Sequence, residues 1–149
     1  MTQAVIFIGL QASGKSSFFN QHFRYSHLLI SRDVVKTRHR EQRLLQVCLD
    51  TQLRFVIDNT NPSITDRAQF IQLAQQAKFE VVGYFFDSPL NDCLAYNRLR
   101  PTERQVPDVA LRDAVRRLQQ PTYAEGFDQL YRVTWHSQQL KVNPIEKSF

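Results

Sequence analysis

The stretch GLQASGKSS, residues Gly9–Ser17, follows the apolar run AVIFI near the start of the chain. It has the spacing of a phosphate-binding loop, in which two glycines separated by four residues precede a lysine and a serine. In such a loop the backbone N–H groups wrap around nucleotide phosphates, and the start of the following helix adds its positive end. The motif requires a strand before it and a helix after it, and this sequence offers both. The stretch therefore predicts a nucleotide-binding domain of the α/β class.

The side chains of this loop have separate expected roles. Lys15 should reach the β and γ phosphates of ATP, and the hydroxyl of Ser16 should bind Mg²⁺. ATP and Mg²⁺ are therefore the expected cofactors, and a chance glycine-rich turn is the alternative. The expected nucleotide-binding residues are Gly9, Ala12, Ser13, Gly14, Lys15, Ser16 and Ser17.

Strands and helices alternate along the rest of the chain. Apolar runs predict strands at 4–9, 27–31, 54–58, 80–87 and 131–135. Helices are expected at 15–24, 34–49, 90–99 and 107–120, and another begins after a Ser63–Asp66 capping box with Ile64, Ala68, Ile71 and Ala74 on one face. This order is typical of a three-layer P-loop NTPase or kinase fold, with a mainly parallel sheet covered by helices on both faces. We expect a single domain over 1–149, with a polar tail from about residue 137.

The composition is that of a globular protein with a basic surface. The 149 residues carry a net charge of +5, with 14 arginines and 5 lysines. Arginine suits bidentate contacts with phosphate, so the bias points to a polyanionic partner, with an ordinary basic soluble surface as an equal alternative that the placement of the arginines must decide. No apolar run approaches a membrane span, and the first residues lack the order of a secretory signal. Cys48 and Cys93 fit reduced core positions, so we expect a cytoplasmic protein with no membrane partner.

Several classes of P-loop protein fit this sequence poorly. A GTPase would normally carry an Asn-Lys-x-Asp motif, which the chain lacks. A motor or AAA-type ATPase would normally need a longer chain and an acidic pair where this chain has Asp58 followed by Asn59. A small kinase fits better, because it needs only a base near the acceptor hydroxyl, an acceptor site and a mobile basic lid.

Asp33 is the predicted general base. It follows the strand expected at 27–31, and ligand-facing residues collect at the carboxyl ends of strands in open α/β sheets. A carboxylate there can orient an acceptor hydroxyl and take its proton late in phosphoryl transfer. The alternative is that Asp33 only caps the helix expected to begin at Val34.

Basic residues crowd the chain beside this aspartate. They are Arg32, Lys36, Arg38 and Arg40. Lys36 and Arg40 are four residues apart and should share a face of the helix expected at 34–49. A solvated face is the usual meaning of such a run. Because this one adjoins the predicted base and replaces apolar residues in the first turns, we expect an acceptor that carries phosphate.

Polar residues also follow the strand expected at 54–58. Asp58 stands where P-loop proteins carry their second acidic motif, and it should orient Mg²⁺ through water or hold an acceptor-site arginine. Asn59 and Asn61 should form hydrogen bonds nearby, although DNTNP is equally good turn chemistry. Asp87, at the end of the strand 80–87, is a weaker rival for the metal.

A basic, proline-broken segment connects the two last expected helices. Arg98, Arg100 and Arg104 lie in or beside it, in a region that closes over the nucleotide in small kinases. An arginine there can neutralise the charge that builds on the transferred phosphoryl group. A merely solvated loop is the alternative.

These motifs together resemble a known family. GLQASGKSS, SRD, IDNTNPS, RLRPTERQVP and PTYAEGF occur in this order from about Val5 to Trp135. They resemble the kinase domain of polynucleotide kinase-phosphatases, which phosphorylate the 5′-hydroxyl ends of nucleic acids with ATP. The resemblance implies that Lys15 and Ser16 contact the ATP phosphates and the metal and that Asp33 is the general base. It also implies that Arg40 lies near the phosphate backbone of the acceptor. Arg100 is the implied lid arginine, with Arg98 close by, and Arg104 is an alternative for that role.

The chain departs from that family in one respect. It has no Asp-x-Asp-Gly phosphatase motif and no forkhead-associated domain, so any 3′-end processing is expected of a separate phosphatase or ligase protein. The leading hypothesis is a 5′-hydroxyl kinase acting on DNA or RNA ends. A P-loop kinase of a small phosphorylated metabolite or nucleoside, and a non-catalytic nucleotide switch, are the alternatives.

The leading hypothesis assigns three sets of site residues. The expected catalytic residues are Lys15, Asp33, Arg98 and Arg100. The expected substrate-binding residues are Arg32, Asp33, Lys36, Arg40, Asp58 and Asn61, and the expected metal ligands are Ser16 and Asp58.

Overall fold

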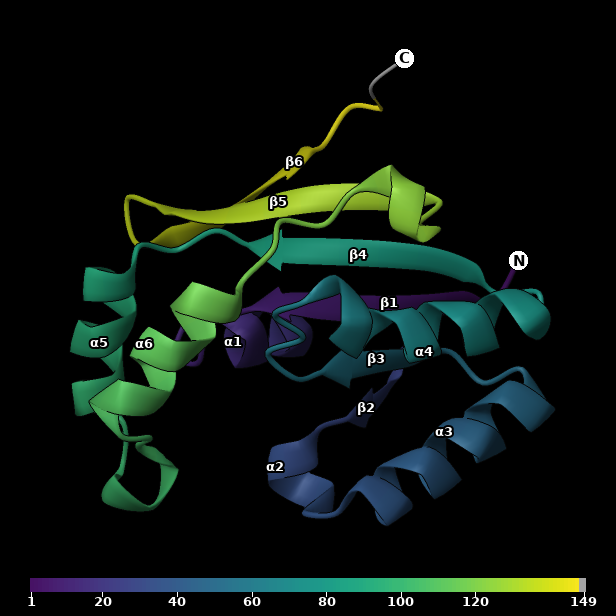
Figure 1. Cartoon of the computed structure of the whole chain (residues 1–149), viewed down its shortest axis with the longest axis horizontal. Coiled ribbons are helices and arrows are strands. Elements are labelled where there is room, and N and C mark those ends of the chain that lie inside the picture. Colours follow the sequence, from purple (N-terminus) through teal and green to yellow (C-terminus); the bar gives the residue numbers. More distant parts are fainter. Residues whose placement is uncertain (148–149) are drawn as a thin grey trace.

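The computed structural model describes residues 1–147, and within them six strands form one sheet (Figure 1). The strands are β1 (Gln3–Gly9), β2 (Leu28–Ile30), β3 (Phe55–Asp58), β4 (Glu80–Phe86), β5 (Gln129–His136) and β6 (Gln139–Pro144). Their order across the sheet is β2-β3-β1-β4-β5-β6. The first five are parallel, and β6 runs antiparallel to β5. The expected mainly parallel sheet is confirmed.

Helices connect the parallel strands and cover both faces of the sheet. They are α1 (Lys15–His22), α2 (Arg32–Val35), α3 (Arg38–Thr51), α4 (Ile64–Gln76), α5 (Leu90–Leu99) and α6 (Asp108–Arg117), with short 3₁₀ turns η1 (Thr102–Arg104) and η2 (Tyr123–Glu125). The carboxyl ends of β1, β3 and β4 point toward the side of the molecule where α5 and α6 lie (Figure 1).

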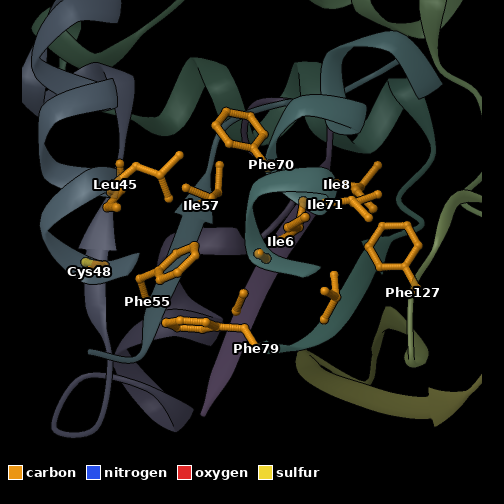
Figure 2. Close-up of a cluster of buried hydrophobic side chains, with 14 of the residues drawn as sticks. Ile6, Ile8, Leu45, Cys48, Phe55, Ile57, Phe70, Ile71, Phe79 and Phe127 are labelled. Carbon is orange, nitrogen blue, oxygen red and sulfur yellow. The ribbon is translucent and has the colours of Figure 1, made fainter. Parts of the chain in front are cut away.

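The central strand β1 is buried on both of its faces. Ala4, Ile6 and Ile8 pack into the cluster that α3 and α4 cover, and Figure 2 shows its side chains. Val5 and Phe7 point to the opposite face and pack against α1. All five side chains are fully buried. Successive side chains of a strand point to opposite faces of the sheet, and helices cover both faces here, so both sets are shielded from water.

The helix expected at 34–49 is in fact two helices. Lys36 ends α2 in a left-handed conformation with φ of 75°. The hydroxyl of Thr37 then accepts a hydrogen bond from the backbone N–H of Arg40 at 3.2 Å, which starts α3. The prediction that Lys36 and Arg40 share one helical face is therefore wrong, because the helix axis changes between them.

The buried face of α4 also differs from the expected one. The capping box of Ser63 and Asp66 is present as predicted. However, Ile64 is 42 % exposed, and the buried residues of this helix are Arg67, Phe70, Ile71 and Ala74. An arginine takes a core position here because its charge is fully paired, as described below.

The polar tail expected from about residue 137 is ordered and partly a strand. Ser137 and Gln138, with φ of 50° and 65°, form a tight turn between β5 and β6. The two strands pair in register, with Trp135 opposite Leu140. Residues 148–149 of the predicted tail lie outside the described residues.

Within residues 1–147, none of the helices combines the length and the apolar character that a membrane crossing requires. Both cysteines, Cys48 and Cys93, are free and buried.

Candidate active site

A cavity of about 560 Å³ opens where the carboxyl ends of β1, β2 and β3 meet the loop between α5 and α6. This is the edge of an open α/β sheet at which ligands bind. The cavity brings together residues that are far apart in the sequence. Of the predicted site residues, it is lined by Ala12, Lys15, Ser16, Arg32, Asp33, Asp58, Asn61 and Arg100.

The loop between β1 and α1 has the backbone geometry of an anion cradle. Ala12 and Gly14 both have positive φ, at 60° and 102°, which turns successive N–H groups toward one side. The first backbone bond of α1 runs from Phe18 N–H to the carbonyl of Gly14 at 2.9 Å, so the preceding N–H groups are free of helical partners. The Ser13 hydroxyl is buried and has no partner among the described residues. The loop therefore fits the triphosphate of a nucleotide.

Lys15 is held at the base of this loop. Its Nζ donates a hydrogen bond to the carbonyl of Gly9 at 2.8 Å, which turns the side chain back over the loop. Burial lowers the pKa of Lys15, and the carboxylates of Asp58 and Asp33 partly offset this change. An ammonium group that is short of water and faces two carboxylates is well placed to bind the phosphates of a nucleotide.

Asp33 lies on α2, and a polar network around the buried carboxylate of Glu41 holds that short helix in place. Glu41 on α3 is 1 % exposed and pairs with the guanidinium of Arg32 at 3.1 Å. The amide of Asn59 donates to Glu41 at 2.8 Å and accepts from the backbone N–H of Arg32 at 3.0 Å. Ser31, not Asp33, occupies the N-cap position of α2, so the carboxylate of Asp33 is left to the cavity that it lines.

Asp58 ends β3 inside the same cavity. Burial raises the pKa of Asp58, with the positive charge of Lys15 opposing the rise and the carboxylate of Asp33 adding to it. None of the ion pairs within residues 1–147 involves this carboxylate. Two aspartates and a lysine are thus close enough to influence one another's charge.

The loop between α5 and α6 adds arginines to the opposite wall. Arg100 and Arg104 line the cavity. Burial and the charge of Arg104 lower the pKa of Arg100, while Asp33 and Asp58 oppose the change. Asn97 closes the base of this loop, because its amide donates to the carbonyl of Val106 at 2.7 Å and accepts from its N–H at 3.1 Å.

Four of the predicted nucleotide-binding residues, Gly9, Ser13, Gly14 and Ser17, belong to the loop between β1 and α1 or its flanks but do not line the cavity. Three of the predicted catalytic and substrate-binding residues lie elsewhere. Arg98, near the end of α5, does not line the cavity; it forms an exposed ion pair with Asp108 at 3.3 Å. Lys36 and Arg40 are also outside, since the break between α2 and α3 turns them from the cavity. Arg40 lines a separate groove on α3. Arg38, which the sequence singled out only as part of the basic run, lines the cavity instead.

The motif IDNTNPS serves chiefly to shape the wall of the cavity. Asn61 has φ of 47° and donates from its buried amide to the carbonyl of Phe7 at 2.8 Å, which joins this turn to β1. The carbonyls of Asn61 and Pro62 accept from the guanidinium of Arg67 at 3.0 and 3.3 Å. Turn chemistry, the alternative considered from the sequence, therefore accounts for much of this motif.

A buried ion pair links this turn to the segment PTYAEGF, and no sequence pattern predicted it. Arg67 is fully buried and forms two hydrogen bonds with Glu125, at 2.8 and 3.1 Å. Glu125 belongs to the segment PTYAEGF and also accepts from the backbone N–H of Thr122. Arg67, which belongs to neither motif, thus connects IDNTNPS to PTYAEGF through its guanidinium group. No local sequence pattern signals this connection.

The cavity also suits a magnesium ion bound together with nucleotide phosphates. Within residues 1–147, no three His, Cys, Asp or Glu side chains gather into a metal site. Mg²⁺ does not need such a cage, because it is usually held by one or two carboxylates plus phosphates and waters. Ser16 and Asp58, the two predicted ligands, line the same cavity and supply the oxygen donors that this ion prefers.

Comparisons with known proteins identify the family and the relatives of this chain. The model of a family described as AAA domain, AAA_33, matches residues 5–121. The chain is 28 % identical over 137 residues to a bifunctional polynucleotide phosphatase/kinase of Schizosaccharomyces pombe, covering 88 % of this chain and 33 % of that protein. It is 27 % identical over 143 residues to a putative protein of the same description from Acanthamoeba polyphaga mimivirus, covering 90 % and 34 %. The chain thus spans about a third of the length of these curated relatives.

Solved structures share the fold at low sequence identity. Kti12 of Chaetomium thermophilum, in complex with ADP-AlF3, has a TM-score of 0.65 at 18 % identity, with 89 % of each chain covered. A gluconokinase of Sinorhizobium meliloti has a TM-score of 0.62 at 14 % identity, covering 89 % of this chain and 82 % of that one. The expected P-loop kinase fold and the resemblance to polynucleotide kinases are both confirmed.

Proposed function

The chain belongs to the AAA domain family AAA_33, a family of P-loop kinase domains, and on this basis we propose that it transfers the γ-phosphate of ATP to the 5′-hydroxyl end of DNA or RNA. The observation that carries the proposal is the single cavity shared by Lys15, Asp33 and Arg100. A nucleotide-binding loop, a carboxylate base and a lid arginine are the parts that phosphoryl transfer to a hydroxyl needs. The likeness to polynucleotide phosphatase/kinases supports the choice of acceptor.

The residues act in the following way under this proposal. Asp33 orients the acceptor hydroxyl and accepts its proton as the acceptor oxygen bonds to the γ-phosphorus and the bond to the β-phosphate oxygen breaks. Lys15 and Arg100 neutralise the charge that spreads over the transferred group. Ser16 and Asp58 would hold Mg²⁺, which would screen the charge of the phosphates.

The arginines in the cavity support a polyanionic acceptor. Arg32 and Arg117 also line it but are paired with Glu41 and Asp66. Arg38, Arg100 and Arg104 take part in none of the ion pairs found within residues 1–147. Arg100 is assigned to the transferred phosphoryl group of ATP, so Arg38 and Arg104 are the two guanidinium groups still available. They favour an acceptor that brings phosphates of its own, which a neutral sugar or nucleoside does not.

A labelling assay with a matched pair of variants tests the proposal. The chain is incubated with γ-labelled ATP, Mg²⁺ and single-stranded 5′-hydroxyl DNA or RNA, and the labelled ends are counted. Asp33→Asn should lower the rate of transfer by about 10²- to 10⁴-fold while ATP still binds. Asp87→Asn is the control, because Asp87 lies outside the cavity beside Arg132 and should have little effect. Absence of label on both DNA and RNA, or full activity of Asp33→Asn, contradicts the proposal.

A further inference from the structure

The only tryptophan of the chain, Trp135, lies directly behind the phosphate-binding loop. It comes from β5, more than a hundred residues along the chain from that loop. Its indole Nε1 donates a hydrogen bond to the carbonyl of Ser13 at 3.3 Å. The hydroxyl of Ser88 donates to the same carbonyl at 3.4 Å. One carbonyl of the loop is therefore held by two donors from other parts of the fold.

Fixing this carbonyl also fixes the N–H group that follows it. The peptide between Ser13 and Gly14 is planar and trans, so its C=O and its N–H point in opposite directions. With the carbonyl held toward Trp135, the N–H of Gly14 faces the other way, into the anion cradle. Backbone N–H groups that are directed before the ligand arrives bind phosphate without the cost of ordering the loop.

The indole ring also fills the space where a side chain at Gly14 would lie. A Cβ placed on Gly14 would come 3.1 Å from the ring carbon Cζ2 of Trp135 and 3.2 Å from Leu140. Gly14 itself has φ of 102°, a conformation that suits glycine. The β5–β6 hairpin thus supports the loop from behind, and Leu140 on β6 contributes to that support.

The opposite side of the indole contacts the helix that leads to the lid. Tyr96 on α5 stacks on Trp135, with ring centroids 5.8 Å apart and an interplanar angle of 30°. Arg100 follows four residues later at the end of the same helix. Trp135 is therefore in contact with both the phosphate-binding loop and the helix that carries the lid arginine.

We propose that Trp135 is a positioning residue that directs the Gly14 N–H toward the nucleotide phosphates and, through Tyr96, sets the position of the lid helix. The inference rests on the proposed binding of ATP, but not on the nature of the acceptor. Removal of the indole N–H should weaken nucleotide binding, and removal of the Tyr96 ring should instead slow the transfer step.

Calorimetric titration with ADP or ATP tests the first half without any acceptor. Trp135→Phe keeps an aromatic ring but loses the donor, so the dissociation constant should rise about three- to tenfold. Tyr131→Phe, in the same strand and remote from the loop, is the control and should bind as the unchanged chain does. Thermal unfolding of each variant separates a local effect from a loss of folding. A folded Trp135→Phe variant that binds nucleotide as tightly as the unchanged chain overturns the inference.

Steady-state kinetics test the second half. Tyr96→Ala should lower kcat with little change in KM for ATP, because the lid arginine acts on the transferred group rather than on nucleotide affinity. Tyr96→Phe retains the stacked ring and should restore kcat. Equal loss in both Tyr96 variants, or a change in KM alone, contradicts the coupling to the lid. If no acceptor is phosphorylated at all, the proposed function fails while the calorimetric result still decides the role of Trp135.

The tryptophan provides a third readout in the unchanged protein. Since every indole signal of the chain comes from Trp135, ADP should alter its fluorescence with the same dissociation constant that calorimetry gives. A dissociation constant from fluorescence that differs from the calorimetric one would show that the emission reports on a site other than the nucleotide-binding loop.

Discussion

At the scale of single residues, the site depends on charges that are partly removed from water and that face one another. Burial lowers the pKa of Lys15 and raises the pKa of Asp58, while each charge partly stabilises the other. Asp33 and Arg100 act on both. Such mutually perturbed groups in a cavity are typical of catalytic sites, although structural ion pairs also produce them.

Arg100 and Arg98 offer a matched comparison. Arg100 lines the cavity, and Arg98, two residues earlier, pairs with Asp108 at the surface. We expect Arg100→Gln to lower kcat by about 10²- to 10³-fold, because it removes a charge aimed at the transferred group. Arg98→Gln should change kcat by less than about twofold. Steady-state phosphorylation of a 5′-hydroxyl oligonucleotide measures both, and a larger effect at Arg98 would contradict the assignment.

Asp58 makes the stability of the nucleotide-free protein depend on pH. Because the pKa of Asp58 is raised above its ordinary value of 3.8, the folded chain holds this proton more tightly than the unfolded chain does. The resulting contribution to stability is complete below pH 3.8 and is lost as the pH rises through the raised value.

Asp58→Asn removes the ionisable group and should therefore gain stability relative to the unchanged chain as the pH rises above about 4. Urea unfolding at several pH values up to about 7 measures the difference in the free energy of unfolding. The same variant should lose phosphoryl transfer. Asp87→Asn, outside the cavity, should show no such gain. A variant at Asp58 that is less stable than the unchanged chain at neutral pH contradicts this account.

At the scale of secondary-structure elements, the pair Arg67–Glu125 joins α4 to η2 and to the turn that shapes the cavity. Removing one member of a buried pair leaves the other charged group without a partner. Arg67→Met should therefore lower the free energy of unfolding by about 3–5 kcal/mol in urea titrations.

Two further variants show whether the loss comes from the unpaired charge. Arg67→Met combined with Glu125→Leu removes both charges and should recover part of the stability. Arg117→Gln breaks an exposed pair with Asp66 and should cost no more than about 1 kcal/mol. Equal losses in the single and double variants would show that packing, not charge, is responsible.

The sequence predicted those helices and strands best that depend on interactions between residues close together in the chain. The buried strands and the capping box of α4 follow from runs of apolar residues and from side chains a few positions apart, and all are present. The break at Lys36 was missed because a left-handed lysine carries no glycine or proline signal. The turn at Ser137 and Gln138 was missed for the same reason, although Leu140 and Val142 alternate as in a strand.

The positions of site residues were predictable where a local sequence motif defines them. They were less predictable where tertiary packing determines the direction of a side chain. Lys15, Ser16 and Asp58 lie where the motif spacing implied. Arg40 lies outside the cavity, because its direction depends on the break in the helix before it. The buried charge of Arg67 depends on a partner 58 residues away, and no local pattern reveals such a pairing.

At the scale of the whole molecule, a basic chain presents arginines around the candidate site. The net charge is +5, and Arg38, Arg100 and Arg104, which form no ion pair within residues 1–147, line the cavity. Binding of a polyanion should therefore weaken steeply as salt concentration rises, because each phosphate contact releases counterions. A small neutral acceptor would show little such dependence. The salt dependence of acceptor binding thus distinguishes the proposed polynucleotide kinase from a kinase of the same fold that acts on a small neutral metabolite.

The most direct test of the central claim is a competition for one labelled phosphate. The chain, γ-labelled ATP and Mg²⁺ are mixed with equal concentrations of 5′-hydroxyl single-stranded DNA, 5′-hydroxyl RNA, a free nucleoside and gluconate, and the products are separated. The account predicts that the label appears on polynucleotide 5′ ends and that the rate falls steeply with added salt. Label on the nucleoside or gluconate in preference to both polynucleotides, or on no acceptor at all, would contradict it.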